Sequence, residues 1–397
     1  MLPGGAFSDE LKLADGRRLL ISPAVPDDAL RIRWLYHLVY GGNYPFSMVY
    51  DPRECAKAIE SDRHIWFLAR DGERAVGSLI FSVDRGIFLG KVFGAVVAEE
   101  FRGLDVAERM LAFGVDIVVN RLKAARSVYA TTRTVSLGPQ RLAEKAGFKK
   151  LGIFPNVHKV NSSETHTLAV YFDPGALADS GGRARLPLVM KPFFDIVRRE
   201  AGLYEPQYVD LSVDPGPGTG TPTAFEVVSA PQFILRRFAE AKGADRLRMD
   251  FFPFHEPNLL LVSADGKTEL YFYRSAKDGH CVLTGAASEN LPLGVMLDQG
   301  AAHLEGMGVR YLEVLVDGAN AERVAEAMAA RFLPSAYYPA MRWDAAGKTA
   351  RDYVVLSRSL AVLDFRGLVL QPAYADYLKE YFRLWREQYV GKVLPGA

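Results

Sequence analysis

The sequence contains few cysteines and almost no net charge. Only two cysteines, Cys55 and Cys281, occur in 397 residues. A disulfide framework is therefore excluded as the basis of the fold, and a reducing compartment is expected. The 48 basic residues nearly balance the 47 acidic ones, which leaves a net charge of +1. Because no strong field would attract polyanions, we expect neither nucleic acid nor a membrane as a partner.

Long apolar runs are also missing. No stretch is long and apolar enough to span a bilayer, and residues 1–7 lack the basic region and apolar core of a signal peptide. We therefore expect a cytoplasmic protein. His255 and His280 stand outside any Cys/His/Asp cluster with metal-ligand spacing, so no metal site is expected. With 49% apolar residues the chain can bury real cores, and its length suggests two or three domains.

Strand and helix signals alternate along the first half of the chain. Alternating or apolar runs predict strands, helical periodicity predicts helices, and Gly147 is placed to end a helix. The expected strands are 17–22, 65–70, 75–83, 91–97, 128–132, 149–154 and 166–172, and the expected helices follow Pro26 and cover about 53–61, 104–122 and 139–146. This order predicts an α/β fold of the α+β type, with a mixed central sheet flanked by helices.

The second half repeats this order of elements. The interval from Phe148 to Phe154-Pro155 equals that from Phe332 to Tyr338-Pro339, and Met110-Leu111 matches Met296-Leu297 in the preceding helices. We interpret this as an old duplication. The predicted division is a first domain at 1–180, a linker helix and Pro/Gly-rich loop at 181–223, a degenerate second domain at 224–363 and a helical tail at 364–397.

A charged loop joins the apolar stretch 92–97 to an amphipathic helix. The first amides of a helix have no intrahelical acceptor, and together with the helix dipole they favour a bound phosphate. A strand, loop and helix in this order are a candidate pyrophosphate cradle. The predicted cofactor-binding residues are Val96, Val97, Arg102, Gly103, Leu104, Asp105, Val106 and Ala107. The alternative to phosphate binding is that this loop is only a polar turn before a buried helix.

Residues 17–172 resemble the GNAT acyltransferase superfamily in element order and motif position. The run Arg102-Gly-Leu-Asp-Val-Ala107 lies where that family has its Arg/Gln-x-x-Gly-x-Gly/Ala loop, and 136–148 is similar to its second motif. The resemblance implies an acyl-CoA donor, acetyl-CoA first of all, and transfer to an amine in the first domain. The second half lacks the motif at 286–294, so we expect that copy not to bind CoA in the usual manner.

Three positions depart from the family pattern. Asp105 replaces a loop glycine, Ala143 replaces a tyrosine thought to protonate the leaving thiolate, and Ser136 replaces a frequent asparagine. We expect the Asp105 carboxylate to cap free amides of the helix and to repel a pyrophosphate. These departures keep an alternative open, in which a non-catalytic relative binds acyl-CoA or a protein partner as a sensor or scaffold.

Several polar and aromatic residues are candidates for the reaction itself. The catalytic candidates are Glu99, Glu100, His166 and Ser136, and the candidates for lining the acceptor pocket are Tyr44, Phe46 and Tyr50. Each has a structural alternative. Glu99 and Glu100 could be a solvated carboxylate pair, and His166 a hydrogen-bonded histidine beside Glu164. Ser136 could be a helix cap, and the three aromatic residues could cover the core. The expected acceptor is a small-molecule or peptide amine, and a homo-oligomer remains open.

Overall fold

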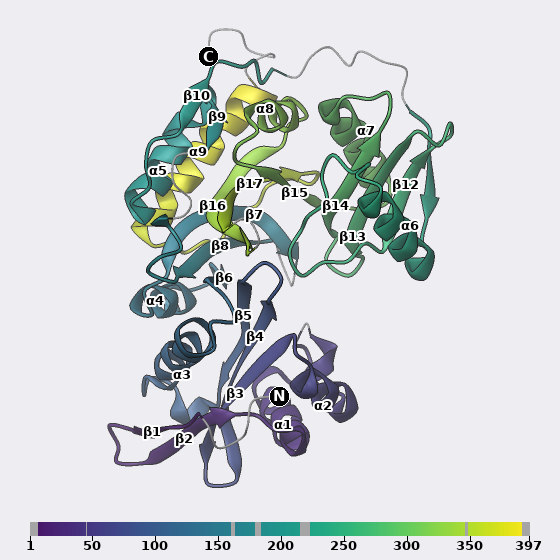
Figure 1. The fold of residues 1–397 in the computed structure, drawn as a ribbon. Helices are drawn as coiled ribbons and strands as arrows, with labels where there is room; N and C mark the ends of the chain where they lie inside the picture. The colour runs from purple at the N-terminus through teal and green to yellow at the C-terminus, as the bar shows by residue number, and fades with distance from the viewer. Residues whose placement is uncertain are drawn as a thin grey trace.

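The computed structural model describes residues 7–44, 46–159, 163–178, 184–214, 223–345 and 348–390. Within these ranges, fifteen strands form one continuous mixed sheet that runs through the whole molecule (Figure 1). Helices cover the sheet along its length, so the predicted mixed α/β fold is confirmed. No helix in the described ranges is long and apolar enough to cross a membrane.

The first half has the predicted order of strands and helices. Its elements are β1 Asp9–Lys12, β2 Arg18–Pro23, α1 Ala29–Tyr40, α2 Pro52–Glu60, β3 His64–Asp71, β4 Arg74–Asp84, β5 Leu89–Val97, α3 Val106–Val115, β6 Ser127–Arg133, α4 Gly138–Lys145, β7 Lys149–Lys159 and β8 Ser163–Phe172. Strand β1 was not predicted. The helix expected over 104–122 begins at Val106 and continues after Val115 as a π-helical turn. Gly147 adopts a φ of +83°, as its predicted role at a helix end requires.

The second half repeats this order. Its elements are β9 Arg185–Pro187, α5 Lys191–Ala201, β10 Gln207–Val209, β11 Phe225–Val228, α6 Pro231–Gly243, β12 Leu259–Ser263, β13 Thr268–Ser275, β14 His280–Ser288, α7 Leu293–Gly306, β15 Tyr311–Asp317, α8 Ala321–Ala329, β16 Leu333–Asp344, β17 Thr349–Ser359 and α9 Pro372–Tyr389. Strands β9, β10, β11 and β16 were not predicted. Most of the Pro/Gly-rich loop, 215–222, lies outside the described residues.

The strand order of one half mirrors that of the other. One half reads β2-β3-β4-β5-β6-β8-β7, and the other reads β11-β12-β13-β14-β15-β17-β16 from the opposite edge. Within this sheet each half contains one parallel pair among the described residues, β5 with β6 and β14 with β15. Unusual backbone conformations recur at matching points of the two halves. Positive φ angles occur at Phe88 and Gly279, at Gly147 and Arg331, and at Asn156 and Ala340.

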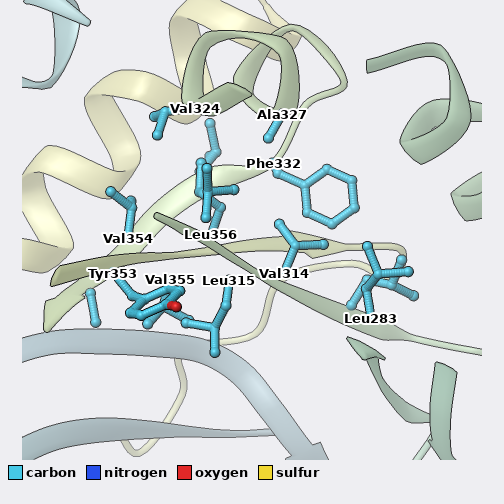
Figure 2. Packing of buried hydrophobic residues seen from close by; sticks show 14 of the residues in the cluster. Leu283, Val314, Leu315, Val324, Ala327, Phe332, Tyr353, Val354, Val355 and Leu356 are labelled. Carbon is cyan, nitrogen blue, oxygen red and sulfur yellow. The ribbon is translucent and has the colours of Figure 1, made fainter. Parts of the chain in front are cut away.

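The two halves meet in the middle of the sheet. β7 pairs with β16 through one register pair, Gly152 with Ala336. One apolar core lies in the first half, and a second joins β7, β8, α5 and α9 to the second half. Figure 2 shows part of this second core, where Val324 and Ala327 of α8 lie over Phe332 and the strands beneath.

The C-terminal helix α9 packs at this junction. Tyr374 and Tyr377 are fully buried and donate hydrogen bonds to the carbonyls of Leu168 and Lys150, at 3.2 and 2.8 Å. The helix also contacts β16 and α5, and Figure 1 shows it in yellow beside them. The partner of the predicted tail helix is therefore the central strands. Cys55 and Cys281 are buried free thiols.

Candidate active site of the first half

Two neighbouring strands of the first half separate from each other. β5 and β6 pair in parallel only from Leu89 to Lys91, opposite Ser127 to Tyr129. Beyond these pairs β5 continues to Val97 beside β4, whereas β6 continues beside β8. The sheet therefore opens between the carboxyl halves of β5 and β6, where backbone groups of β5 are left without a strand partner on that side.

A bulge in β5 lies at this opening. The register with β4 jumps from Phe93 to Val96, so Gly94 and Ala95 oppose a single residue of β4. Gly94 has a φ of +68°, and a Cβ there would lie 2.8 Å from the Tyr36 hydroxyl. Its carbonyl accepts a hydrogen bond of 2.6 Å from that hydroxyl, which is fully buried. The bulge is thus held by one tyrosine and requires glycine on two independent grounds.

The loop after β5 leads into α3, whose first amides have no intrahelical acceptor. Asp105 is the N-cap residue, but its side chain makes no capping hydrogen bond. Our expectation that its carboxylate caps these amides is therefore wrong. Asp105 adopts a left-handed φ of +58°. Its side chain is 73% exposed, and its carboxylate lies 4.0 Å from the Lys145 ammonium. Arg102 donates from Nε to the Val97 carbonyl at 3.2 Å and ties the loop to β5.

The loop between α1 and α2 brings aromatic rings against the bulge. The Phe46 ring lies 4.9 Å from Phe93 of β5 and 5.7 Å from Tyr44. Tyr44 packs on Tyr36 at 4.9 Å, and its amide donates to the Tyr50 hydroxyl at 2.8 Å. Burial raises the pKa of Tyr44 well above its usual value, so this phenol stays neutral. The three aromatic candidates therefore gather beside the opening between β5 and β6.

His166 lies on the same strand as a buried carboxylate. Arg133 of β6 is opposite His166 in the β6–β8 register. Glu164 accepts two hydrogen bonds from Arg133, at 2.8 and 2.6 Å, and lies 3.8 Å from His166 Nε2. The contact with His166 and the Arg133 guanidinium lower the pKa of Glu164 to about 2, although burial opposes this shift. Among the described residues, none accepts or donates a hydrogen bond at His166 Nε2.

The other catalytic candidates are more exposed. Glu100 forms an ion pair of 2.6 Å with Arg74, and its pKa is lowered by a backbone hydrogen bond and by Arg74. Glu99 is exposed in the same turn. Ser136 is exposed as well, but the N-cap of α4 is Leu137 and has no side-chain cap. The alternative interpretation of Ser136 as a helix cap is therefore wrong.

Sequence reasoning missed several residues at this site. Gly94, an isolated glycine within a strand, is a recognised signal of a bulge that could have been used. Tyr36 lies in the helix predicted after Pro26 but was not singled out, and its bond to Gly94 spans 58 positions. No spacing rule predicts such a partner. Ala143 is buried in α4 and places no hydroxyl there.

A surface pocket of about 590 Å³ lies beside α1, and none of the three aromatic candidates lines it. It is lined by Leu30, Arg31, Arg33, Trp34, His37, Arg74 and Ala75. In the ranges that the structure describes, no three His, Cys, Asp or Glu side chains are arranged to hold a metal ion.

A family of known proteins matches part of the first half. Residues 29–148 match the family described as "Acetyltransferase (GNAT) family". This is the family that the sequence resemblance implied, and the match covers only these residues. The matched segment contains the α3 loop, the bulge in β5 and the aromatic loop. No curated protein matches the chain.

Solved structures of acetyltransferases resemble part of the chain. A ribosomal-protein-S5-alanine acetyltransferase from Vibrio fischeri is 15% identical over 42% of this chain and 97% of its own, with a TM-score of 0.37. A spermidine N-acetyltransferase from Vibrio cholerae is 14% identical over 40% of this chain and 95% of its own, with a TM-score of 0.35. An aminoglycoside 6'-N-acetyltransferase complexed with coenzyme A is 19% identical over 38% and 96%, with a TM-score of 0.32.

Proposed function

We propose that the first half transfers an acyl group, acetyl in the simplest case, from acyl-CoA to an amine. The observation that carries this proposal is the combination of separated strands β5 and β6, a bulge at Gly94 and an uncapped helix start. Together they offer unpaired backbone amides along one path from the α3 loop to the middle of β5. This arrangement fits an extended ligand that ends in a diphosphate.

The α3 loop holds the diphosphate in this account. Amides from Gly103 to Ala107 donate to it, and the helix dipole adds a favourable field. Because Asp105 points its carboxylate toward Lys145 instead of the amides, the amides stay available. Arg102 is exposed beside them, and its tie to the Val97 carbonyl fixes its position. The fit of the loop to a diphosphate therefore survives the replacement of the family's glycine.

The acceptor amine approaches from the aromatic loop. Acyl-CoA supplies a thioester, whose carbonyl carbon the neutral amine attacks. A backbone amide of the β5 bulge near Val96 stabilises negative charge on the carbonyl oxygen. Phe46 and Tyr44 shield this point from water, and His166 is the base candidate that the geometry favours over Glu99 and Glu100. Its Nε2 is unpartnered, whereas Glu100 is neutralised by Arg74.

We assign the acyl-CoA site to the first half alone. The second half has the same separation of its parallel strands, because β14 and β15 pair only from His280 to Val282. Its helix α7, however, begins at the N-cap residue Pro292, and the charged Arg-Gly loop of the first half is absent from the sequence there. We therefore place one CoA site in each chain.

An assay of thiol release tests this function. The full chain is incubated with acetyl-CoA and a panel of amines, namely polyamines, amino acids, aminoglycosides and peptide N-termini. Thiol release above the hydrolysis rate with any amine, abolished by Arg102→Glu, supports the proposal. Tight acetyl-CoA binding without turnover of any amine supports the non-catalytic alternative, which the missing hydroxyl at Ala143 motivates. Absence of both binding and turnover contradicts both.

A further inference from the structure

Three histidines from both halves lie in a row at the junction. The ring of His158, on β7, lies 4.9 Å from His166 on β8 and 5.6 Å from His280 on β14. A carboxylate stands at each end of the row. Glu164 is 3.8 Å from His166 Nε2, and Glu313 of β15 is 3.7 Å from His280 Nε2. The order in space is therefore carboxylate, three imidazoles, carboxylate.

The row starts beside the candidate site and ends in the second half. His166 is opposite Arg133, on the strand that borders the opening between β5 and β6. His280 is the first residue of β14, one of the two parallel strands of the second half. The side chains of His166 and His280 keep 12% and 11% of their surface exposed. Both end histidines thus keep some exposed surface, although the Nε2 atom of His166 is buried, and the carboxylates beside them are 8% and 10% exposed.

The charges around the row keep its middle neutral. Burial, the other two imidazoles and the Lys91 ammonium together lower the pKa of His158 to about 3. Lys91 lies over the Tyr129 ring and is attracted by Glu313. Three further groups face the row. Arg133 donates to Glu164, and the Tyr311 ring stacks on His280 at 5.8 Å. His255 lies near the row as well, and burial lowers its pKa to about 3. A neutral imidazole carries one N–H and one free nitrogen, so it can pass a proton without holding it.

We infer that Glu164, His166, His158, His280 and Glu313 form a proton relay, through which the second half serves the reaction of the first. This inference rests on the proposed acyl transfer. An acceptor ammonium gives one proton to His166 and becomes a neutral amine. Its nitrogen then forms the bond to the acyl carbon, the carbon–sulfur bond breaks, and the departing sulfur takes the second proton of the nitrogen. The relay delivers the first proton to water at the His280 end.

The first test is a titration of the histidine side chains in the ligand-free protein, followed by nitrogen-detected NMR. In a connected row the protonation of one ring changes that of the next. Glu313→Gln and His280→Asn should each shift the titration of His166, although neither substituted residue touches it. His37→Asn, at an exposed histidine on α1, is the control and should shift nothing. Unchanged titration of His166 in both relay variants would overturn the relay, whatever the activity of the protein.

The second test uses turnover with the best amine of the panel. His280→Ala should lower kcat about tenfold, leave KM for acetyl-CoA unchanged, and regain rate when free imidazole is added. A structural role of His280 would not be restored by imidazole, so loss of rate without rescue would contradict the relay. Unaltered kcat would contradict it as well. If no amine is acylated, the proposed function fails, and the NMR titration still decides whether the row is connected.

Discussion

Gly152 of β7 and Ala336 of β16 are paired at the centre of the sheet and occupy matching positions of the two halves. Each lies four residues after the phenylalanine that follows α4 or α8, Phe148 or Phe332. The two halves thus meet at equivalent residues, as two copies related by a twofold axis would. This relationship supports the proposed duplication more strongly than the shared Phe-to-Pro spacing.

The junction should not tolerate a side chain at Gly152. A Cβ there would overlap the Ser335 carbonyl and the Ala336 methyl group, so strands β7 and β16 would have to move apart. We expect Gly152→Ala to lower the free energy of unfolding by about 1–3 kcal/mol, as overpacking does. Denaturant unfolding measures this change.

Gly243→Ala is the matched control for this substitution. A Cβ at Gly243, at the end of α6, meets no atom within 4 Å. This variant should be as stable as the parent or slightly more stable. Equal stability of Gly152→Ala and the parent would contradict the close approach of the two strands.

The Tyr36 hydroxyl should hold the bulge of β5 in place. Tyr36→Phe leaves the Gly94 carbonyl without its 2.6 Å hydrogen bond in a buried setting. We expect a loss of about 1–3 kcal/mol in stability and a lower rate of acyl transfer, with less effect on CoA affinity. Urea unfolding and thiol release are the measurements. Tyr204→Phe, at a tyrosine that is 77% exposed, should change neither quantity.

Asp105 should weaken CoA binding by its charge. Because its carboxylate lies beside the first turn of α3, Asp105→Gly should lower the dissociation constant for CoA about three- to tenfold, and high salt should reduce this gain. Asp105→Asn removes the charge but keeps a residue that tolerates positive φ. Both variants should bind more tightly in calorimetry. Tighter binding by Asp105→Gly alone would assign the effect to the backbone, and weaker binding by both would contradict the placement of the diphosphate.

His158 should make the protein sensitive to acid. In the unfolded chain its pKa is near 6.5, whereas in the folded protein it is about 3. The unfolded state therefore binds more protons between these values, so stability is full above pH 6.5 and falls as the pH falls. His158→Gln should remove about 1–3 kcal/mol of this pH dependence between pH 7 and 4. Identical pH profiles of stability for parent and variant would contradict the buried, neutral state of His158.

The sequence predicts the local elements better than their partners. The helix ends at Gly147 and the strands around Asp71-Gly72 follow from residue type, because turns and caps are local. Strand β16 was missed, because the prolines Pro334 and Pro339 argue against a strand. Its place beside β7 in the middle of the sheet depends on contacts nearly 200 residues apart. The packing of α9 against the central strands could not be predicted for the same reason.

The candidate site also contains features that the sequence predicted and features that it did not. The α3 loop and its link to β5 were predicted because they are contiguous in sequence, and the aromatic loop was predicted to face the site. The orientation of the Asp105 side chain was not, because it depends on a left-handed backbone and on Lys145, which lies 40 positions later. The sequence did not predict that His280 and Glu313 lie near His166, because only the mirrored strand order of the sheet brings these residues together.

The most direct measurement is a crystal structure of the full chain with bound CoA. The account predicts one CoA per chain, with its diphosphate within hydrogen-bonding distance of the amides of Gly103 to Ala107 and its pantetheine between β5 and β6. A diphosphate bound elsewhere, for instance at the start of α7, would contradict it.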